Sequence, residues 1–467
     1  MLSFFRINDP YRLLFVFLVL LVFRLPYIVG GLPLTLPELE WMIVGEAMAN
    51  GKMMYGEIWD DLGPLSALAY QIVHWAFGKS QLAYQLLSLT LVFFQAAIFN
   101  RLLLINKAYN ENTYVPALVY VICMSANFEF LTLSPVLMST TFMLLAINNI
   151  FKRIDNFTLD ELFLNTGLYL GIAALFYFPS VLFLVSTMLS LRLFTSAIPR
   201  RLMLLAFGFV QIIGLALLYY YWFDAAKEFY FQFFRFPFVA IRDHFLGWTS
   251  LVTTGAVLIV FFMLSLMKLY SKIYYVNYQV KFQSAMMLIL LSSWISLFLV
   301  RNLSASNLIL LIPPGAFFIS HLLLLTGRKL KAEMILYSFI FLIFGYQFVV
   351  GKNLKQIRQI VDFSKLYVPE ETSSNKIYDK KLLVLGDDIS FYKENMLATP
   401  YLNWQLSRLH FDQLNYYDVL TDIFNNFNGD PPEVIIDLED RLPALFEKMP
   451  TIGLKYKKSG DTYIIKE

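Results

Sequence analysis

Long apolar runs recur along most of the chain and predict membrane-spanning helices. A helix needs about 20 mostly apolar residues to cross the hydrocarbon core of a bilayer. By this rule we predict about eleven spans, at residues 11–30, 82–104, 113–131, 134–151, 163–178, 179–196, 202–223, 249–269, 284–300, 307–326 and 333–350. The pattern predicts a mainly α-helical, polytopic bundle over residues 1–351.

After this bundle the apolar runs shorten and alternate between two kinds of element. Short runs that are rich in β-branched and aromatic residues and bounded by turn residues are typical of strands. We predict strands at 381–386 and 433–437, helices at 401–410 and 441–449, and a closing hairpin at 454–456 and 462–465. This order predicts a small α/β domain over 379–467, joined to the bundle by a linker at 352–378.

Basic residues mark every second turn between the predicted spans, and Lys and Arg gather in cytoplasmic loops. The basic turns carry Arg6 and Arg12, Arg101 and Lys107, Lys152 and Arg153, Arg200 and Arg201, Lys268, Lys272 and Lys281, and Arg328, Lys329 and Lys331. The turns at 129–134 and 178–180 have no basic residue. We therefore expect a cytoplasmic N-terminus. The usage of Phe, Tyr, Ile, Asn and Lys favours a bacterium, so the expected location is its inner membrane. An odd number of spans then places the C-terminal domain in the periplasm.

Composition agrees with a membrane protein and excludes several functions. Of the 467 residues, 58% are hydrophobic and 15% charged, far from the balance of a soluble domain. A net charge of +3 does not favour nucleic acid. One cysteine and four scattered histidines exclude a disulfide framework and a Cys/His metal cluster. The sequence has no P-loop, and the predicted spans have almost no ionisable residues near the midplane, with Arg24 toward the outer end of the first span. An ATP-driven pump and an ion-coupled transporter are therefore disfavoured.

The first external loop, at 31–80, holds the main candidates for chemistry. Thr35 and Pro37 predict the start of a helix that carries Glu38 and Glu40 in its first turn. The helix dipole keeps carboxylates there ionised, as a general base or a metal ligand must be. Acids at helix starts are also common for stability alone, so both interpretations stay open.

A second acidic pair, Asp60 and Asp61, precedes an apolar stretch that is too short to span the membrane. We predict that this stretch is a surface or re-entrant helix. Paired acids at such a boundary suit the orientation of a polar substrate or the binding of a cation. A second external segment, 224–248, is rich in aromatic residues and predicts an interfacial helix.

The order and spacing of these motifs resemble the GT-C superfamily of polyprenyl-phosphate-sugar glycosyltransferases. The likeness is strongest to its protein-mannosyltransferase-like and aminoarabinose-transferase-like branch. In the first loop it rests on Glu38, Trp41, Gly51, Tyr55, Asp60 or Asp61, Pro64, Leu65 and residues 77–80. Elsewhere it rests on the Gly-rich segment 167–180, on Arg301 with 307–314, and on 384–386, 398–401 and 432–436 in the tail.

The resemblance implies transfer of a sugar from a lipid phosphate to an extracytoplasmic acceptor in cell-envelope assembly. Glu38 is then the expected general base, with Glu40 as the competing candidate. Asp60 and Asp61 would orient the acceptor or hold a divalent cation, and Tyr55 would contact substrate. The expected partners are the lipid-linked sugar and the membrane, with no nucleic acid.

Three further residues receive roles from the resemblance. Arg301 would meet the lipid phosphate, although an Arg at a helix end is also a common interfacial anchor. His74 would contact a headgroup or serve as a packing residue. Glu129 would line the cavity.

The sequence also departs from the family pattern. The family's catalytic Asp falls on Pro37, and its expected cations fall near Gln85 and near Tyr177 or Phe178. Its late His-Tyr pair falls near Ser306 and Asn307. These departures favour the alternative function, a catalytically inactive relative that acts as a structural or assembly partner in an envelope complex.

Overall fold

The chain forms two compact units, each of which is described by itself. The computed structural model describes residues 1–154, 159–195, 197–242, 244–270, 275–351, 363–369, 377–460 and 462–466. The membrane unit comprises residues 1–32, 81–215 and 242–365. The α/β unit comprises residues 33–80, 216–241 and 366–467.

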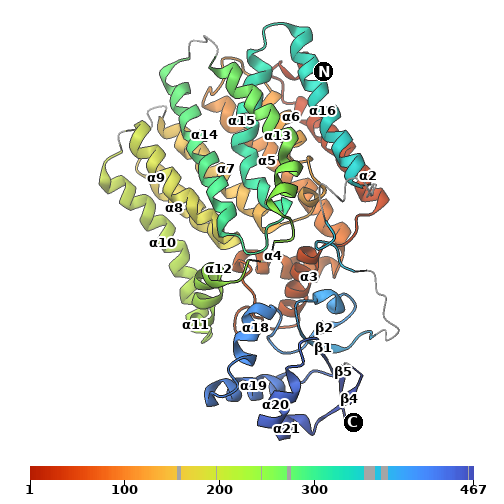
Figure 1. Ribbon diagram of the computed structural model, residues 1–467. Helices are drawn as coiled ribbons and strands as arrows, with labels where there is room; N and C mark the ends of the chain where they lie inside the picture. Colours follow the sequence, from red (N-terminus) through yellow and green to blue (C-terminus); the bar gives the residue numbers. More distant parts are fainter. Residues whose placement is uncertain are drawn as a thin grey trace. The chain divides into compact units, whose positions relative to one another are not determined.

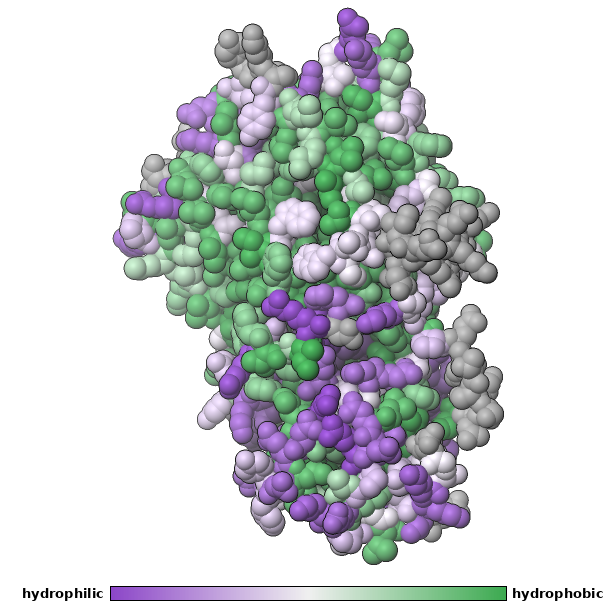
Figure 2. Space-filling model, in the orientation of Figure 1, coloured by the Kyte–Doolittle hydropathy of each residue, from purple (hydrophilic) through white to green (hydrophobic). Residues whose placement is uncertain are grey.

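Helices lie at all eleven predicted spans, so the mainly α-helical fold is confirmed (Figure 1). They are α2 (Arg12–Gly30), α5 (Gln81–Ile105), α6 (Val115–Cys123), α7 (Pro135–Ile154), α8 (Glu161–Phe176), α9 (Leu182–Thr195), α10 (Pro199–Trp222), α13 (Trp248–Leu269), α14 (Asn277–Ser296), α15 (Ile312–Leu325) and α16 (Lys329–Gly351). Among the described residues, eight helical segments are long and apolar enough to cross a membrane. The protein is therefore a multi-pass membrane protein. Hydrophobic side chains dominate the membrane unit on the face drawn in Figure 2.

The eight membrane-length segments do not include α6, α7 and α8. The prediction of one continuous span over 113–131 is wrong, because α6 ends at Cys123 and a separate 3₁₀ turn, η1 (Phe128–Leu131), follows. Similar short turns adjoin other spans: η2 (Phe178–Val181), η4 (Leu297–Leu299) and η5 (Ala305–Leu311). These irregular segments leave backbone groups that the rest of the unit has to satisfy.

Two helices of the membrane unit approach closely at glycines. A Cβ at Gly167 of α8 would clash with the carbonyl oxygen of Leu205 in α10. A Cβ at Gly208 of α10 would lie 2.5 Å from the carbonyl oxygen of Leu164 in α8. Small residues at such crossings let helix backbones touch, which is a common way to pack helices in membranes.

The α/β unit is built on a five-stranded sheet with the order β2-β1-β3-β5-β4. Its strands are β1 (Lys381–Leu385), β2 (Met396–Leu397), β3 (Val434–Asp437), β4 (Tyr456–Ser459) and β5 (Thr462–Ile465). The central strand β1 is parallel to β2 and β3, whereas β5 is antiparallel to β3 and β4. The two predicted strands are confirmed, and the closing hairpin is present with its first strand at Tyr456–Ser459 rather than at 454–456.

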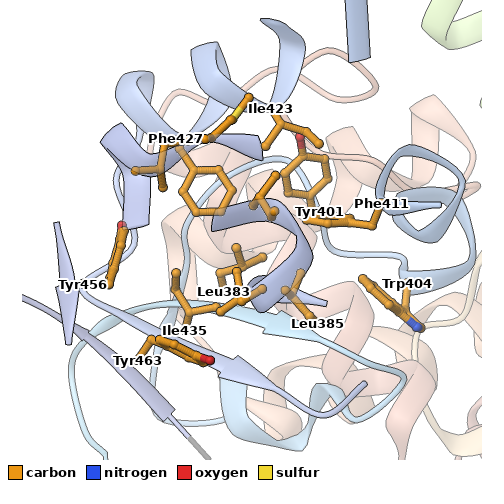
Figure 3. Packing of buried hydrophobic residues seen from close by; sticks show 14 residues of the cluster. Leu383, Leu385, Tyr401, Trp404, Phe411, Ile423, Phe427, Ile435, Tyr456 and Tyr463 are labelled. Carbon is orange, nitrogen blue, oxygen red and sulfur yellow. The ribbon is translucent and has the colours of Figure 1, made fainter. Parts of the chain in front are cut away.

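The helices of this unit are α18 (Trp404–Phe411), α19 (Tyr417–Gly429), α20 (Leu442–Lys448) and α21 (Pro450–Gly453). They help to bury Leu383, Leu385 and Ile435 of the sheet in one hydrophobic core (Figure 3). Helix α18 begins three residues later than predicted. The reason is that the side chain of Asn403 accepts a hydrogen bond from Leu406 N at 3.4 Å and so caps the helix.

The first external loop belongs to the α/β unit. Its helices α3 (Leu36–Ala49) and α4 (Pro64–Phe77) pack as a pair, with the rings of Trp41 and Tyr70 stacked at 5.7 Å. A Cβ at Gly45 would lie 2.7 Å from the carbonyl oxygen of Tyr70, so only glycine permits this approach.

The described end of the predicted linker also pairs with the start of this loop. Leu36 N donates to Leu366 O at 2.8 Å, and Val368 N donates to Leu34 O at 3.0 Å. Residues 352–362 and 370–376 of the linker lie outside the described residues. The predicted domain boundaries therefore remain predictions.

The α8–α10 crossing generates a stability prediction. Gly167→Ala should destabilise the protein by about 1–3 kcal/mol, because the new methyl group forces two backbones apart. Gly214→Ala on α10 is the matched control, since a Cβ there meets nothing within 4 Å. Thermal unfolding of both purified variants in detergent checks this, and equal midpoints would contradict the crossing.

Candidate active site

Glu38 lies at the start of α3, where its carboxylate forms part of a capping box. Its Oε2 atom accepts from the backbone N and the Oγ1 of Thr35, both at 3.2 Å. In return, Glu38 N donates to Thr35 Oγ1 at 3.4 Å. Glu38 is 4% exposed, whereas Glu40 is only partly buried. Residues two positions apart on a helix do not share a face, so the two acids do not act on one point together.

Tyr55 shapes the loop that follows α3. Its φ angle is +71°, a left-handed conformation that is uncommon for a bulky residue. The buried ring contacts Tyr220 and Phe229, with ring centres 5.0 and 5.1 Å away, and its hydroxyl donates to Leu62 O at 2.7 Å. Burial, followed by nearby Tyr220 and the acids at 60 and 61, raises the pKa of Tyr55 well above its ordinary value. Tyr55 therefore stays a neutral hydrogen-bond donor.

The acidic pair is brought next to two residues that the sequence did not single out. Asp60 is 2% exposed, and its Oδ1 accepts from Leu62 N at 2.7 Å. Its backbone N donates to Gln232 Oε1 at 3.1 Å. The Oδ1 of Asp61 accepts from Asn403 Nδ2 at 3.5 Å.

The acidic pair by itself forms only part of a cation site. Within the described ranges, no group of three or more His, Cys, Asp or Glu residues is arranged to hold a metal ion. Magnesium is often held by one or two carboxylates together with substrate phosphates and water. Asp60 and Asp61 fit that arrangement only when a substrate supplies oxygen ligands, and the divalent cation remains a prediction.

His74 lies near the end of α4, beside a lysine that ties the loop to the α/β domain. Lys79 Nζ lies 2.7 Å from Glu46 Oε2 and donates to the carbonyl oxygens of Tyr392 and Asn395. Burial lowers the pKa of His74, Glu46 raises it and Lys79 lowers it, with a net decrease. His74 is therefore neutral at pH 7 and does not offer a fixed positive charge to a phosphate.

Two more contacts bind the loop to the α/β domain. Lys52 Nζ lies 2.5 Å from Asp430 Oδ2 and donates to Leu397 O at 2.7 Å. The Trp59 ring packs edge-on against Tyr401 and His410 and joins the hydrophobic core. The loop and the domain are therefore one packed structure.

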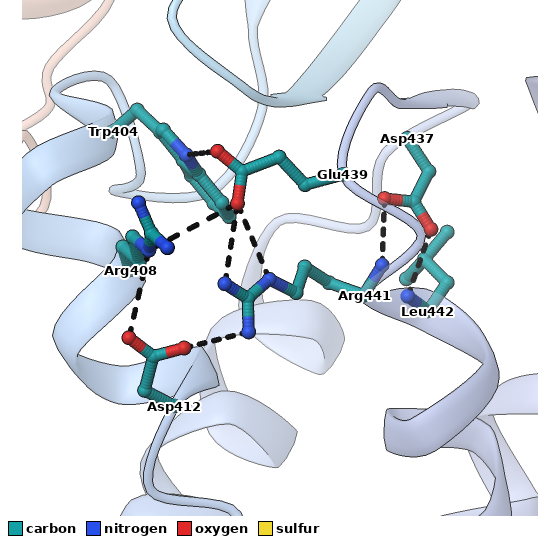
Figure 4. A network of polar contacts seen from close by, with 7 residues as sticks. All are labelled: Trp404, Arg408, Asp412, Asp437, Glu439, Arg441 and Leu442. Carbon is teal, nitrogen blue, oxygen red and sulfur yellow. Dashed lines mark hydrogen bonds and ion pairs between the residues drawn. The ribbon is translucent and has the colours of Figure 1, made fainter.

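A polar network holds α18 to the connection between β3 and α20 (Figure 4). The carboxylate of Glu439 accepts from Trp404 Nε1 at 2.6 Å and pairs with Arg441 at 3.2 Å. Arg441 also pairs with Asp412 at 2.6 Å. All of these groups satisfy one another, so the network serves the architecture of the domain.

Glu129 and Arg301 lie in the membrane unit, whereas the loop acids lie in the α/β unit. The carboxylate oxygens of Glu129 accept from Ala305 N at 3.1 Å and from Ser306 N at 3.2 Å, at the start of η5. Arg301 lies just before this turn, partly exposed, between η4 and η5. The predicted site residues thus form two groups.

In the membrane unit, two residues that depart from the family pattern contact each other. Asn307 Nδ2 donates to the Tyr177 hydroxyl at 2.8 Å. These polar groups are neutral, where the resemblance expects a lysine and a His-Tyr pair. Arg24 is 1% exposed, and it donates to Ser88 Oγ at 2.9 Å and to Phe130 O at 3.1 Å.

An apolar groove lies in the membrane unit among α13, α14 and α15. Its lining includes Gly255, Phe262, Trp294, Leu308, Gly315 and Ile319. Val252 and Met263, also on its wall, are 49% and 54% exposed, so the groove is open on one side. No charged residue is among the residues that line it.

The fold is similar to that of a known membrane protein. A crystal structure of ArnT from Cupriavidus metallidurans bound to undecaprenyl phosphate matches with a TM-score of 0.57 and 12% identity, over 98% of each chain. ArnT from the same organism in the apo state covers 67% of this chain and 59% of its own, with a TM-score of 0.47 and 13% identity. The sequence matches no protein-family model and no curated protein. The chain therefore has an ArnT-like fold, as the motif order implied.

The tie between loop and domain generates a prediction about pH. Burial raises the pKa of Asp430, but Lys381 and Lys52 outweigh it and hold the pKa below the ordinary 3.8. A lowered folded-state pKa stabilises the fold above the ordinary pKa, and this is lost as pH falls through the folded-state value. Asp430→Asn should cost about 1–2 kcal/mol at pH 7 and progressively less below about pH 4. Thermal unfolding from pH 7 to 3 checks this, with the exposed Asp422→Asn as control; a loss independent of pH would contradict it.

Proposed function

We propose that this protein is a membrane glycosyltransferase that moves a sugar from a polyprenyl-phosphate donor to an extracytoplasmic acceptor. The observation that carries the proposal is the likeness to undecaprenyl-phosphate-bound ArnT over 98% of the chain. Fold alone does not imply function. The acids of the first loop and the apolar groove supply the site-level support.

The reaction needs a base for the acceptor and stabilisation of the leaving phosphate. A carboxylate takes the proton of the acceptor hydroxyl while that oxygen attacks the anomeric carbon. The bond between the sugar and the phosphate oxygen breaks, and its electron pair leaves with the polyprenyl phosphate. The products are the glycosylated acceptor, the free lipid phosphate and a protonated carboxyl group.

The residues divide between these tasks according to their chemistry. Glu38 is the proposed base, with Glu40 as the competing candidate. Asp60, Asp61 and Tyr55 would orient the acceptor, and the acidic pair would hold a divalent cation. Arg301 would neutralise the leaving phosphate.

The other two candidates take smaller roles. The neutral His74 would contact a headgroup by hydrogen bonding rather than by charge. Glu129 would keep its hold on η5 and line the cavity from that position. With the N-terminus in the cytoplasm, the first loop and the α/β domain would lie in the periplasm, where a bacterial lipid-linked sugar is used.

The groove among α13, α14 and α15 suits the lipid part of the donor. A prenyl chain has no polar groups, and the lining is mainly apolar, with no charged residue that the chain would strip of water. The open side of the groove would admit such a chain laterally from the surrounding membrane.

A second candidate function is an inactive relative that serves as an assembly partner in an envelope complex. The carboxylate oxygens of Glu38 and Glu129 both accept hydrogen bonds from backbone N–H groups, which is a structural role for these acids. The neutral Tyr177 and Asn307 stand where the family pattern expects charged or basic groups. A protein with such residues would keep the fold but lack the catalytic chemistry.

Glu38→Gln separates the two candidates, because Gln preserves a capping box but cannot accept a proton as a base. In a deletion strain it should express normally yet fail to restore one envelope sugar, read by mass spectrometry of glycans and glycoproteins. Thr35→Ala is the control, since it weakens the helix cap by about 1 kcal/mol and keeps the carboxylate. Full restoration by Glu38→Gln and by Glu40→Gln would favour the inactive relative.

The groove gives an independent prediction about the lipid. Gly315→Phe should fill it and weaken binding of undecaprenyl phosphate about tenfold or more, equivalent to about 1.4 kcal/mol. Gly345→Phe on α16 is the control, because a side chain there also meets open space. Native mass spectrometry of both purified variants with added lipid measures the change; equal binding would remove the groove from the donor site.

A further inference from the structure

One buried amide side chain bridges both ends of the turn that carries the acidic pair. Gln232 Nε2 donates to Tyr55 O at 2.9 Å, and its Oε1 accepts from Asp60 N at 3.1 Å. Gln232 is 4% exposed and lies 172 residues along the chain from Asp60. Both hydrogen-bonding groups of its amide are therefore used on the backbone of the turn.

Gln232 lies in an unusual piece of backbone. It is part of a π-helical turn, η3 (Tyr230–Arg235), between α11 (Ala226–Phe229) and α12 (Phe236–Val239). Such turns are rare and are frequent at functional sites. Phe229 and Phe233, on either side of Gln232, are fully buried, and Phe229 contacts the Tyr55 ring. The π turn thus directs Gln232 at the loop.

The turn that it holds is itself in an uncommon conformation. Tyr55 has a φ of +71°, and bulky residues persist in this region only where their surroundings impose it. The imposing contacts are the Tyr55 hydroxyl to Leu62, the ring contacts, and the amide of Gln232 on the Tyr55 carbonyl. The side chain of Gln232 therefore joins the π-helical turn η3 to the left-handed turn at Tyr55.

The α/β domain holds the same turn at Trp59, between Tyr55 and Asp60. Trp59 N donates to Pro400 O at 2.7 Å, and Asn403 N donates to Trp59 O at 3.1 Å. The side chain of Asn403 extends this contact by donating from Nδ2 to Asp61 Oδ1 at 3.5 Å. Asn403 thus reaches the Asp61 carboxylate itself, while Gln232 reaches the backbone of Asp60.

We infer that Gln232 and Asn403 are positioning residues that fix the acidic pair Asp60–Asp61 for the acceptor. Gln232 acts through the backbone on both sides of the turn, and Asn403 acts through the carboxylate. This inference rests on the proposed function, in which the pair orients an acceptor hydroxyl. It also assigns residues 216–241 of the α/β unit and the α/β domain one common task, which is to order the loop.

Hydrogen exchange tests the hold on the loop without any need for a substrate. In purified full-length protein in nanodiscs, Gln232→Met should speed amide exchange in peptides covering residues 53–61 by about tenfold, since two hydrogen bonds to the turn are lost. Gln71→Met is the matched control, because Gln71 donates to Met48 O at 3.0 Å in the same unit but away from the turn. Unchanged exchange at 53–61, or an equal increase across the unit, overturns the inference.

Asn403 is tested with two variants that both preserve the helix cap. Serine and aspartate cap helices as well as asparagine does, so α18 should remain intact in both. Asn403→Asp places a carboxylate opposite Asp61, and the two like charges repel each other. Exchange at 57–62 should therefore be faster in Asn403→Asp than in Asn403→Ser at pH 7.5. Equal exchange in the two variants overturns the role of Asn403.

A glycan readout then separates positioning from the proposed function. In the deletion strain, Gln232→Met should lose the same envelope sugar as the Asp60→Asn/Asp61→Asn pair, at normal protein level, whereas Gln71→Met should restore it. If the acid pair loses the sugar and Gln232→Met does not, Gln232 is not a positioning residue. If the acid-pair variant restores the sugar fully, the proposed function of this loop fails, and exchange still decides whether Gln232 orders it.

Discussion

The structure depends on the requirement that backbone polar groups inside a bilayer find partners within the protein. Regular helices satisfy it along most of the membrane unit. Where α6 ends and η1 begins, Arg24 donates to the carbonyl oxygen of Phe130. Where η5 begins, the Glu129 carboxylate accepts from two backbone N–H groups. Two buried charged residues of this unit, Arg24 and Glu129, thus bind the backbone at breaks in its helix geometry.

The same accounting explains the loop acids. Glu38 satisfies groups at the start of α3, and Asp60 satisfies Leu62 N in the following turn. A carboxylate that accepts such bonds is fixed in position and stays in place for chemistry. The two uses are compatible when one oxygen holds the backbone and the other faces a substrate. In the proposed transferase that second oxygen takes part in the reaction, whereas in the inactive relative it does not.

The α/β domain has a similar double character. Its core is a conventional sheet covered by helices, and Trp59 of the first loop completes it. Lys52 near the middle of the loop and Lys79 at its end add ionic and carbonyl contacts. A domain joined to the loop so closely influences the loop acids whenever it is perturbed. We therefore regard it as part of the candidate site rather than as an appendage.

The sequence by itself determined the spans, the strands of the tail and the placement of acids in the first loop. These follow from local rules, because apolar length, strand alternation and helix-start chemistry are properties of neighbouring residues. The broken span at 113–131 was missed, since its apolar composition continues through a bend that long-range partners such as Arg24 satisfy. Only the tertiary structure brought Gln232 and Asn403 to Asp60 and Asp61. Hydrogen bonds between residues separated by 172 and 342 positions leave no periodic signal in the chain, and only folding creates them.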